Sequence, residues 1–251
     1  MEDPVRHDGL DPPHPHHPRG APTIRRLLKQ GVLAGIAGGA ALAVVLRLIG
    51  EGPIGRAVAL EGSTGNDMFS RGTQQIGGML SAVVYGAALG ALFTIAFAAV
   101  RHQLRATDDW RAAVALAAAG FSAVFLLPFL KYPANPPGVG EPDTITRRTV
   151  LYLIAVGWSL VATWGGWRAW RALVARGWAA YKAVPATLLT WVALAAVGLA
   201  VLPANSDPVN VPATLIWQFR LATLAGSATF WSVVGLTFGW LRMRDTAAAG
   251  A

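Results

Sequence analysis

The sequence contains no cysteine and few charged residues. The absence of cysteine excludes disulfides, zinc fingers, iron–sulfur clusters and thiolate catalysis. Charged residues make up 14% of the 251-residue chain, well below the share of about 25% in an ordinary soluble domain. Hydrophobic residues make up 54%, and the mean hydropathy is +0.45. This balance excludes a soluble globular protein, a disordered chain and a fibre, and it predicts an integral membrane protein.

Sequence motifs of common enzymes are also missing. The chain has no G-x-x-x-x-G-K-[ST] loop for nucleotide phosphates, no H-E-x-x-H zinc-protease motif and no G-x-S-x-G nucleophile motif. No pair of carboxylates lies inside an apolar run, where a proton relay would need one. We therefore predict that the protein is not an enzyme.

Six apolar runs each reach about 18 residues or more, the length that a helix needs to cross the hydrocarbon core. They contain no Asp, Glu, Lys or His and a single arginine, Arg47. The sequence predicts an all-α integral membrane protein, a six-transmembrane-helix bundle with three long Pro/Gly-rich extracytoplasmic loops. A disordered His/Pro-rich tail (1–24) would precede the membrane domain (25–242), and a short C-terminus (243–251) would follow it. The predicted spans are 31–49, 76–100, 112–130, 150–167, 183–202 and 221–240.

The distribution of lysine and arginine predicts the orientation. Fourteen of them lie in the tail, in the connections 101–111 and 168–182, and at the C-terminus, whereas six lie in the three opposite segments. Basic residues concentrate on the cytoplasmic side of membrane proteins. Both termini are therefore predicted to be cytoplasmic, and an even number of spans agrees with this because it places both termini on the same side. The basic excess is assigned to topology and not to nucleic-acid binding.

Small residues recur four positions apart in several predicted spans. Such spacing forms a groove in which two helix backbones approach closely. It predicts tight packing of the first two spans, although glycine and alanine are also simply common in this chain. The positions are Gly31, Gly35, Gly39 and Ala43 in the first span, Gly78, Ala82, Gly86 and Gly90 in the second, and Gly235 with Gly239 in the sixth.

The three segments on the predicted outer side, 51–75, 131–149 and 203–220, are rich in proline and glycine. Pro133-Ala134-Asn135 recurs as Pro203-Ala204-Asn205, each directly after a predicted span. Proline stiffens such segments, and irregular backbone at membrane depth persists only where it is buried or lines a wet cavity. We therefore predict that the three segments fold inward over one polar vestibule. The alternative is that their charges are solvated and form weak surface ion pairs.

Two carboxylates stand out among the outer charges. Glu51 and Glu61 lie at the ends of apolar stretches, where a charge is costly without a partner. Arg47 lies one helical turn before Glu51 and is its expected partner. The candidate transport residues, all charged or amide side chains near the spans, are Glu51, Glu61, Arg71, Lys131, Asn135, Arg148, Asn205 and Arg220.

The outer segments also carry a family resemblance. The run PFLKYPANPP from Pro128 to Pro137, the pair Phe219-Arg220, and the stretch from Glu51 to Glu61 resemble the CbtA family of bacterial cobalt transporter subunits. The resemblance covers roughly residues 25–242 and leaves the histidine-bearing tail outside it. It implies a permease subunit for Co²⁺ uptake in the plasma (inner) membrane, linked to cobalamin synthesis. It also implies a small single-span CbtB-like partner subunit with a histidine-rich end, but it supplies no metal ligands.

Candidate metal ligands must come from the residues themselves. Co²⁺ accepts imidazole nitrogen and carboxylate or water oxygen. No predicted span contains histidine, so ligands in the membrane domain would be Glu51, Glu61 and Asn135, whereas His14 and His17 could chelate a metal in the tail. We expect no permanently bound cofactor, with Co²⁺ as the transported ion.

Two other functions stay open. The outer arginines could bind an anionic corrinoid or another small solute as cargo. The chain could also be a non-transporting scaffold for the small histidine-rich partner.

Overall fold

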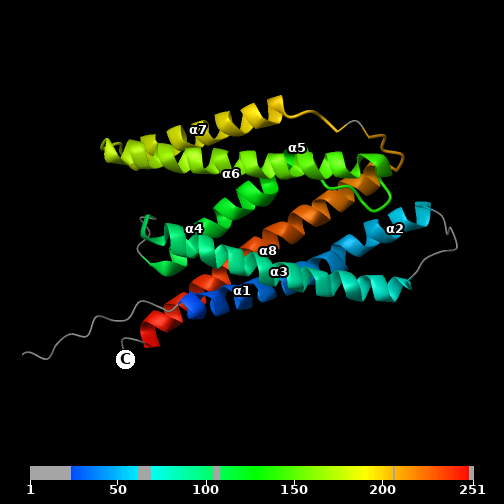
Figure 1. Ribbon diagram of the computed structural model, residues 1–251, viewed down its shortest axis with the longest axis horizontal. Helices are drawn as coiled ribbons and strands as arrows, with labels where there is room; N and C mark the ends of the chain where they lie inside the picture. The colour runs from blue at the N-terminus through cyan, green and yellow to red at the C-terminus, as the bar shows by residue number, and fades with distance from the viewer. Residues whose placement is uncertain (1–23, 62–68, 104–107, 206, 249–251) are drawn as a thin grey trace, which may run out of the picture.

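The computed structural model describes residues 24–61, 69–103, 108–205 and 207–248. Within these ranges the chain is helical without strands, and six helical stretches are long and apolar enough to cross a membrane. This confirms the predicted all-α fold with six spans (Figure 1). The α-helices are α1 (Ile24–Val45), α2 (Glu51–Glu61), α3 (Arg71–Val100), α4 (Asp109–Gly120), α5 (Leu127–Lys131), α6 (Ile145–Ala175), α7 (Ala180–Val201) and α8 (Ala213–Ala248).

Two of the six stretches each contain two α-helices joined by a π-helical turn. α1 continues into α2 through Leu46–Gly50, and α4 continues into α5 through Phe121–Leu126. Such turns interrupt the regular hydrogen-bond ladder of a helix and are frequent near functional sites. Here they connect the packed part of each stretch to its outer end, where Glu51 and Lys131 lie.

The outer segments are less irregular than the sequence predicted. Residues 51–61 form α2, and α3 and α8 begin earlier than the apolar runs suggested. Proline and glycine predict loops here, but Pro53 follows a π-helical turn and Pro212 directly precedes α8. At these positions a missing N–H costs little. Residues 243–248, predicted as part of a separate C-terminus, continue α8. The predicted tail lies outside the described residues, apart from Ile24.

Small residues hold α1 and α3 together. Gly31 and Gly35 of α1 face Gly86 and Gly90 of α3. A Cβ atom on Gly35 would lie 2.1 Å from the Gly86 carbonyl oxygen, and one on Gly90 would lie 2.1 Å from the Gly31 carbonyl oxygen. Only glycine therefore permits this approach, which confirms the predicted packing of the first two spans. Gly78 lies outside the interface, because a Cβ there would meet nothing within 4 Å.

α8 packs against both α1 and α4. Gly235 lies against Ala117 of α4, and Gly239 lies against Trp110, which confirms the packing role of this glycine pair. Phe93 and Phe97 of α3 contact Phe238 of α8 in edge-to-face geometry. Buried aromatic pairs of this kind add to the stability that apolar burial already gives. These four helices form the main core of the protein.

α6 and α7 form a separate antiparallel pair beside this core (Figure 1). Ala162 of α6 and Ala195 of α7 pack with Leu127 of α5 in a second small core. The pair is joined to the rest of the molecule mainly through α5 and the π-helical turn before it. The outer ends of α5, α6 and α7 consequently lie close together.

A polar cluster lies at the opposite end of the helices, and we call it the Asp109 cluster. Asp109 of α4 accepts hydrogen bonds from Arg242 of α8 at 2.7 and 3.0 Å, and a further one from Arg101, which follows α3. Nearby, the Gln30 side chain of α1 donates to Asp245 of α8 at 2.6 Å. These contacts connect α1, α4, α8 and the end of α3.

Candidate functional site

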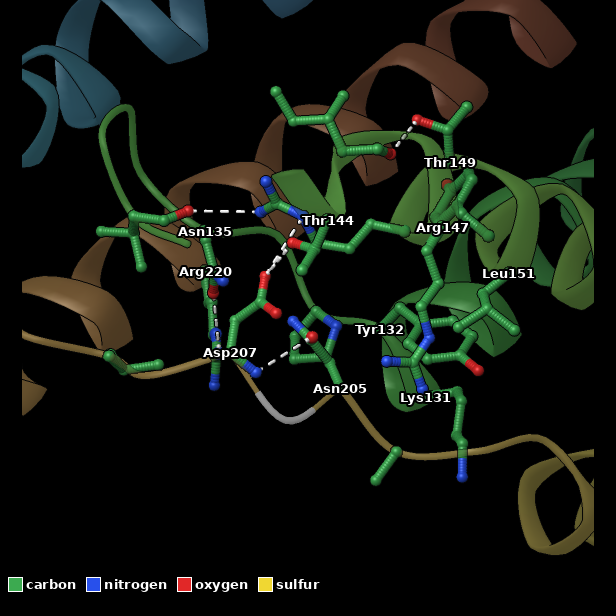
Figure 2. Close-up of a pocket in the computed structure, with 17 residues that line it drawn as sticks. Lys131, Tyr132, Asn135, Thr144, Arg147, Thr149, Leu151, Asn205, Asp207 and Arg220 are labelled. Atoms are coloured by element: carbon green, nitrogen blue, oxygen red, sulfur yellow. Dashed lines mark hydrogen bonds and ion pairs between the residues drawn. The ribbon is translucent and has the colours of Figure 1, made fainter. Parts of the chain in front are cut away.

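A cavity of about 580 Å³, here called the outer pocket, lies where the segments 131–149 and 203–220 meet (Figure 2). Both Pro-Ala-Asn sequences contribute to it, through Asn135 in the first segment and Asn205 in the second. The structure therefore brings two of the three outer segments together over one polar cavity. Five of the eight candidate residues line it: Lys131, Asn135, Arg148, Asn205 and Arg220.

The end of α5 is fixed against the end of α7. The Lys131 ammonium donates to the Leu199 carbonyl at 2.7 Å, and the Tyr132 hydroxyl donates to the Pro203 carbonyl at 2.7 Å. Carbonyl groups at the C-terminal end of a helix lack partners within the helix and attract cations. Burial raises the pKa of the Tyr132 phenol, with nearby Arg147 acting in the opposite direction. The phenol stays protonated at neutral pH and can donate this hydrogen bond.

Arg220 connects α8 to the first Pro-Ala-Asn sequence. Its Nε donates to the Ala134 carbonyl at 3.2 Å, and one terminal nitrogen donates to the Asn135 side-chain oxygen at 3.0 Å. Arg220 therefore has two hydrogen-bond acceptors at the wall of the outer pocket.

Asp207 is the centre of the opposite wall of the outer pocket. Its carboxylate accepts a hydrogen bond of 2.6 Å from the Thr144 hydroxyl and forms an ion pair of 3.3 Å with Arg148. The Asp207 side chain is only 6% exposed. Its charge lies next to the N-terminus of α6, where the helix dipole favours an anion. The sequence places Asp207 among the carboxylates of the expected vestibule, but nothing in it distinguishes Asp207 from the others.

Arg148 also holds the preceding loop in place. Its two terminal nitrogens donate to the carbonyls of Val139 and Glu141 at 3.3 and 3.2 Å. Gly140 lies between them with φ of 105°, a conformation that other residues rarely adopt. A Cβ on Gly140 would lie 2.4 Å from the Arg148 guanidinium. Glycine at this position therefore permits both the turn and the close approach of the arginine.

Glu51 and Arg71 form a second, smaller site. Arg71 of α3 donates to the Glu51 carboxylate at 2.7 Å, and the Gln75 side chain donates to the same oxygen at 2.8 Å. These residues line a cavity of about 160 Å³ together with Arg47 and Gln74. Arg71 is thus the partner that Glu51 requires, although the sequence suggested Arg47.

The described residues of the first segment, 51–61 and 69–75, do not line the outer pocket, so the expectation of one vestibule under three segments is not met by them. Glu51 and Arg71 do not line the outer pocket; α2 continues α1 as a helix and packs against α8, and Glu51 at its first position pairs with Arg71 at the start of α3. Glu61 is the last residue of α2. His14 and His17 lie outside the described residues. Among the described residues, no group of three or more His, Cys, Asp or Glu side chains could hold a metal ion.

Six apolar helices, with polar cavities at the end opposite the Asp109 cluster, define a multi-pass membrane protein. The family model "Probable cobalt transporter subunit (CbtA)" matches residues 24–243, so the chain belongs to the CbtA family. No curated protein and no solved structure matches the chain. As a subunit of a transporter, the protein functions with a partner, and the family indicates transport and not catalysis.

Proposed function

We propose that this protein is the membrane permease subunit for Co²⁺ uptake, in a bacterial inner membrane, and that its cargo serves cobalamin synthesis. The observation that carries the proposal is the family match over residues 24–243, which includes all six helices. The chain functions with a small single-span CbtB-like subunit that supplies histidine ligands. Such a division of roles is consistent with the absence of a metal-binding cluster from the described residues.

In this proposal both termini are cytoplasmic, and the Asp109 cluster lies at the cytoplasmic end. The excess of lysine and arginine in the segments of that end supports this orientation. Arginines also lie over tryptophan rings there, an arrangement suited to the boundary between lipid and water. The pairs are Arg168 with Trp164, Arg171 with Trp167, and Arg244 with Trp240.

The Glu51 site is the proposed point at which the metal contacts the chain. Glu51 offers a carboxylate, and Gln74 and Gln75 offer amide oxygens, all of them acceptable ligands for Co²⁺. Metal binding there requires the Arg71 side chain to release the Glu51 carboxylate. Glu61 is a further candidate oxygen ligand, and His14 and His17 would receive the metal in the cytoplasm. Asn135 is a weaker candidate, because its side-chain oxygen accepts a hydrogen bond from Arg220 among the cations of the outer pocket.

The membrane potential provides sufficient driving force. Moving one divalent cation inward across about 100 mV releases about 4.6 kcal/mol, twice the value for a single charge. The chain has no nucleotide-binding loop of its own. Uptake driven by the potential therefore needs no ATP-hydrolysing site in this subunit.

The test is Co²⁺ flux into proteoliposomes that contain a metal-sensitive dye, with a potassium diffusion potential negative inside. We expect flux with the full complex, and flux that falls when the potential is removed. The full complex failing to move Co²⁺ would contradict the proposal. A chain that co-purifies with the small subunit while neither the chain nor the complex gives flux would be a scaffold.

A further inference from the structure

The outer pocket carries more positive charge than a bare metal ion would tolerate. Four of its lining side chains are cationic, and Asp207 is the single carboxylate among the described residues that line it. Asp207 already pairs with Arg148 and Thr144. A divalent cation in this pocket would meet mainly like charge, which is unfavourable in a partly enclosed site. The cationic residues are Lys131, Arg147, Arg148 and Arg220.

The four cationic side chains differ in how many of their N–H groups are already hydrogen-bonded within the protein. Arg148 and Arg220 hold the two outer segments through hydrogen bonds to carbonyl and carboxamide oxygens. Lys131 donates one of its three N–H groups to Leu199 and has two left. Arg147 is exposed, lines the pocket and has no hydrogen bond or ion pair with any described residue. Arg147 and Lys131 are therefore available to a ligand.

Figure 2 shows how these groups are distributed. Asp207 and Asn205 lie between Arg220 on one side and the pair of Lys131 and Arg147 on the other. The Asp207 side of the pocket already stabilises one carboxylate with a hydroxyl and a guanidinium. The side with Arg147 and Lys131 also offers a guanidinium and an ammonium as hydrogen-bond donors, but no carboxylate of the described residues accepts from them. Arginine suits such a ligand because its planar fork matches two carboxylate oxygens.

We propose that the outer pocket binds a polycarboxylate, and that Co²⁺ reaches this protein as an anionic complex with such a chelator. The cavity of about 580 Å³ has the size of a site for a small organic ligand. A complex of Co²⁺ with one tricarboxylate keeps a net negative charge, and its outward oxygens accept hydrogen bonds. The part of the inference that concerns the metal rests on the proposed function, whereas polycarboxylate binding by itself does not.

The experiment measures binding to the full chain, purified in a neutral detergent at low ionic strength. The probes are citrate, Co²⁺–citrate, CoCl₂ alone and inorganic phosphate, each followed by calorimetry or equilibrium dialysis. Citrate and Co²⁺–citrate should bind saturably, and Arg147→Gln should weaken both by about tenfold or more. Lys131→Gln should act in the same direction, and added salt should weaken binding. Arg56→Gln is the matched control, because Arg56 pairs with Gln218 and lines a different cavity.

Several results would overturn the inference. One is citrate or Co²⁺–citrate that does not bind, or that binds equally to the wild type and to a folded Arg147→Gln variant. Another is a pocket occupied by lipid: citrate binding that is lost in phosphatidylglycerol nanodiscs but kept in phosphatidylcholine nanodiscs would assign the pocket to an anionic lipid headgroup. Phosphate that binds more tightly than citrate would also exclude a polycarboxylate site. Citrate binding without any Co²⁺ flux would instead contradict the proposed function and leave the anion site intact.

Discussion

Asp109 of α4 and Arg242 of α8 form the most buried ion pair of the described residues, with the Arg242 side chain only 8% exposed. They are 133 residues apart in the chain. Arg101 completes the arrangement on the other carboxylate oxygen. One carboxylate thus compensates two guanidinium groups at the end where α3, α4 and α8 meet.

Asp109→Asn should therefore destabilise the protein considerably. Removing one partner of a buried pair leaves an uncompensated charge and typically costs about 3–5 kcal/mol. Thermal unfolding in detergent, followed by circular dichroism or by intrinsic fluorescence, measures the loss. Glu141→Gln is the control, since the Glu141 side chain is exposed. An equal melting temperature for the wild type and Asp109→Asn would show that water or lipid compensates the arginines.

The close contact of α1 and α3 predicts that two glycines of α3, Gly77 and Gly86, will respond differently to the same substitution. A Cβ on Gly86 would lie 2.3 Å from the Gly35 carbonyl oxygen, whereas a Cβ on Gly77 of the same helix would meet nothing within 4 Å. Gly86→Ala should therefore cost about 1–3 kcal/mol through forced separation of the backbones. Gly77→Ala should be neutral or slightly stabilising, because alanine favours helix. Similar melting temperatures of the two variants would disprove close α1–α3 packing.

The fold could be predicted from the sequence because each relevant signal is local. A run of apolar residues long enough to cross a membrane is visible in a single window, and so is the spacing of Gly31, Gly35 and Gly39. The outer pocket could be predicted only in part. Its walls depend on contacts between residues such as Lys131 and Leu199, 68 positions apart, which no local pattern reveals. The proline and glycines of residues 51–61 predict a loop, whereas these residues continue the first span as a helix after a π-helical turn.

The Glu51 site predicts a specific effect on transport. Glu51→Gln keeps the size of the side chain but removes its charge, leaving Arg71 without a carboxylate at 2.7 Å. Initial Co²⁺ uptake in proteoliposomes should fall about tenfold or more, equivalent to roughly 1.4 kcal/mol or more of lost stabilisation. Glu141→Gln serves again as an exposed control. Unchanged uptake by a well-folded Glu51→Gln variant would show that Co²⁺ does not bind at Glu51 during transport.

The position of Asp207 predicts that its removal strengthens citrate binding to the outer pocket, whereas Arg147→Gln should weaken it. Asp207→Asn removes the carboxylate that pairs with Arg148 and makes the outer pocket more positive. Citrate should bind several times more tightly to this variant, as one compensating charge in a partly enclosed site is lost. Asp143→Asn is the matched control, because Asp143 is exposed and does not line the pocket. Weaker citrate binding by Asp207→Asn would mean that Asp207 mainly maintains the shape of the cavity.

The absence of cysteine makes the orientation directly testable. Single-cysteine variants can be made at two exposed alanines, Ala213 at the start of α8 and Ala179 just before α7, and neither changes a charge. With both termini in the cytoplasm, Ala213→Cys should react with a membrane-impermeant maleimide in intact spheroplasts. Ala179→Cys should react only after permeabilisation, because the basic connection between α6 and α7 stays inside. The reverse labelling would place the outer pocket in the cytoplasm, where it could receive no external cargo, and the uptake proposal would then be wrong.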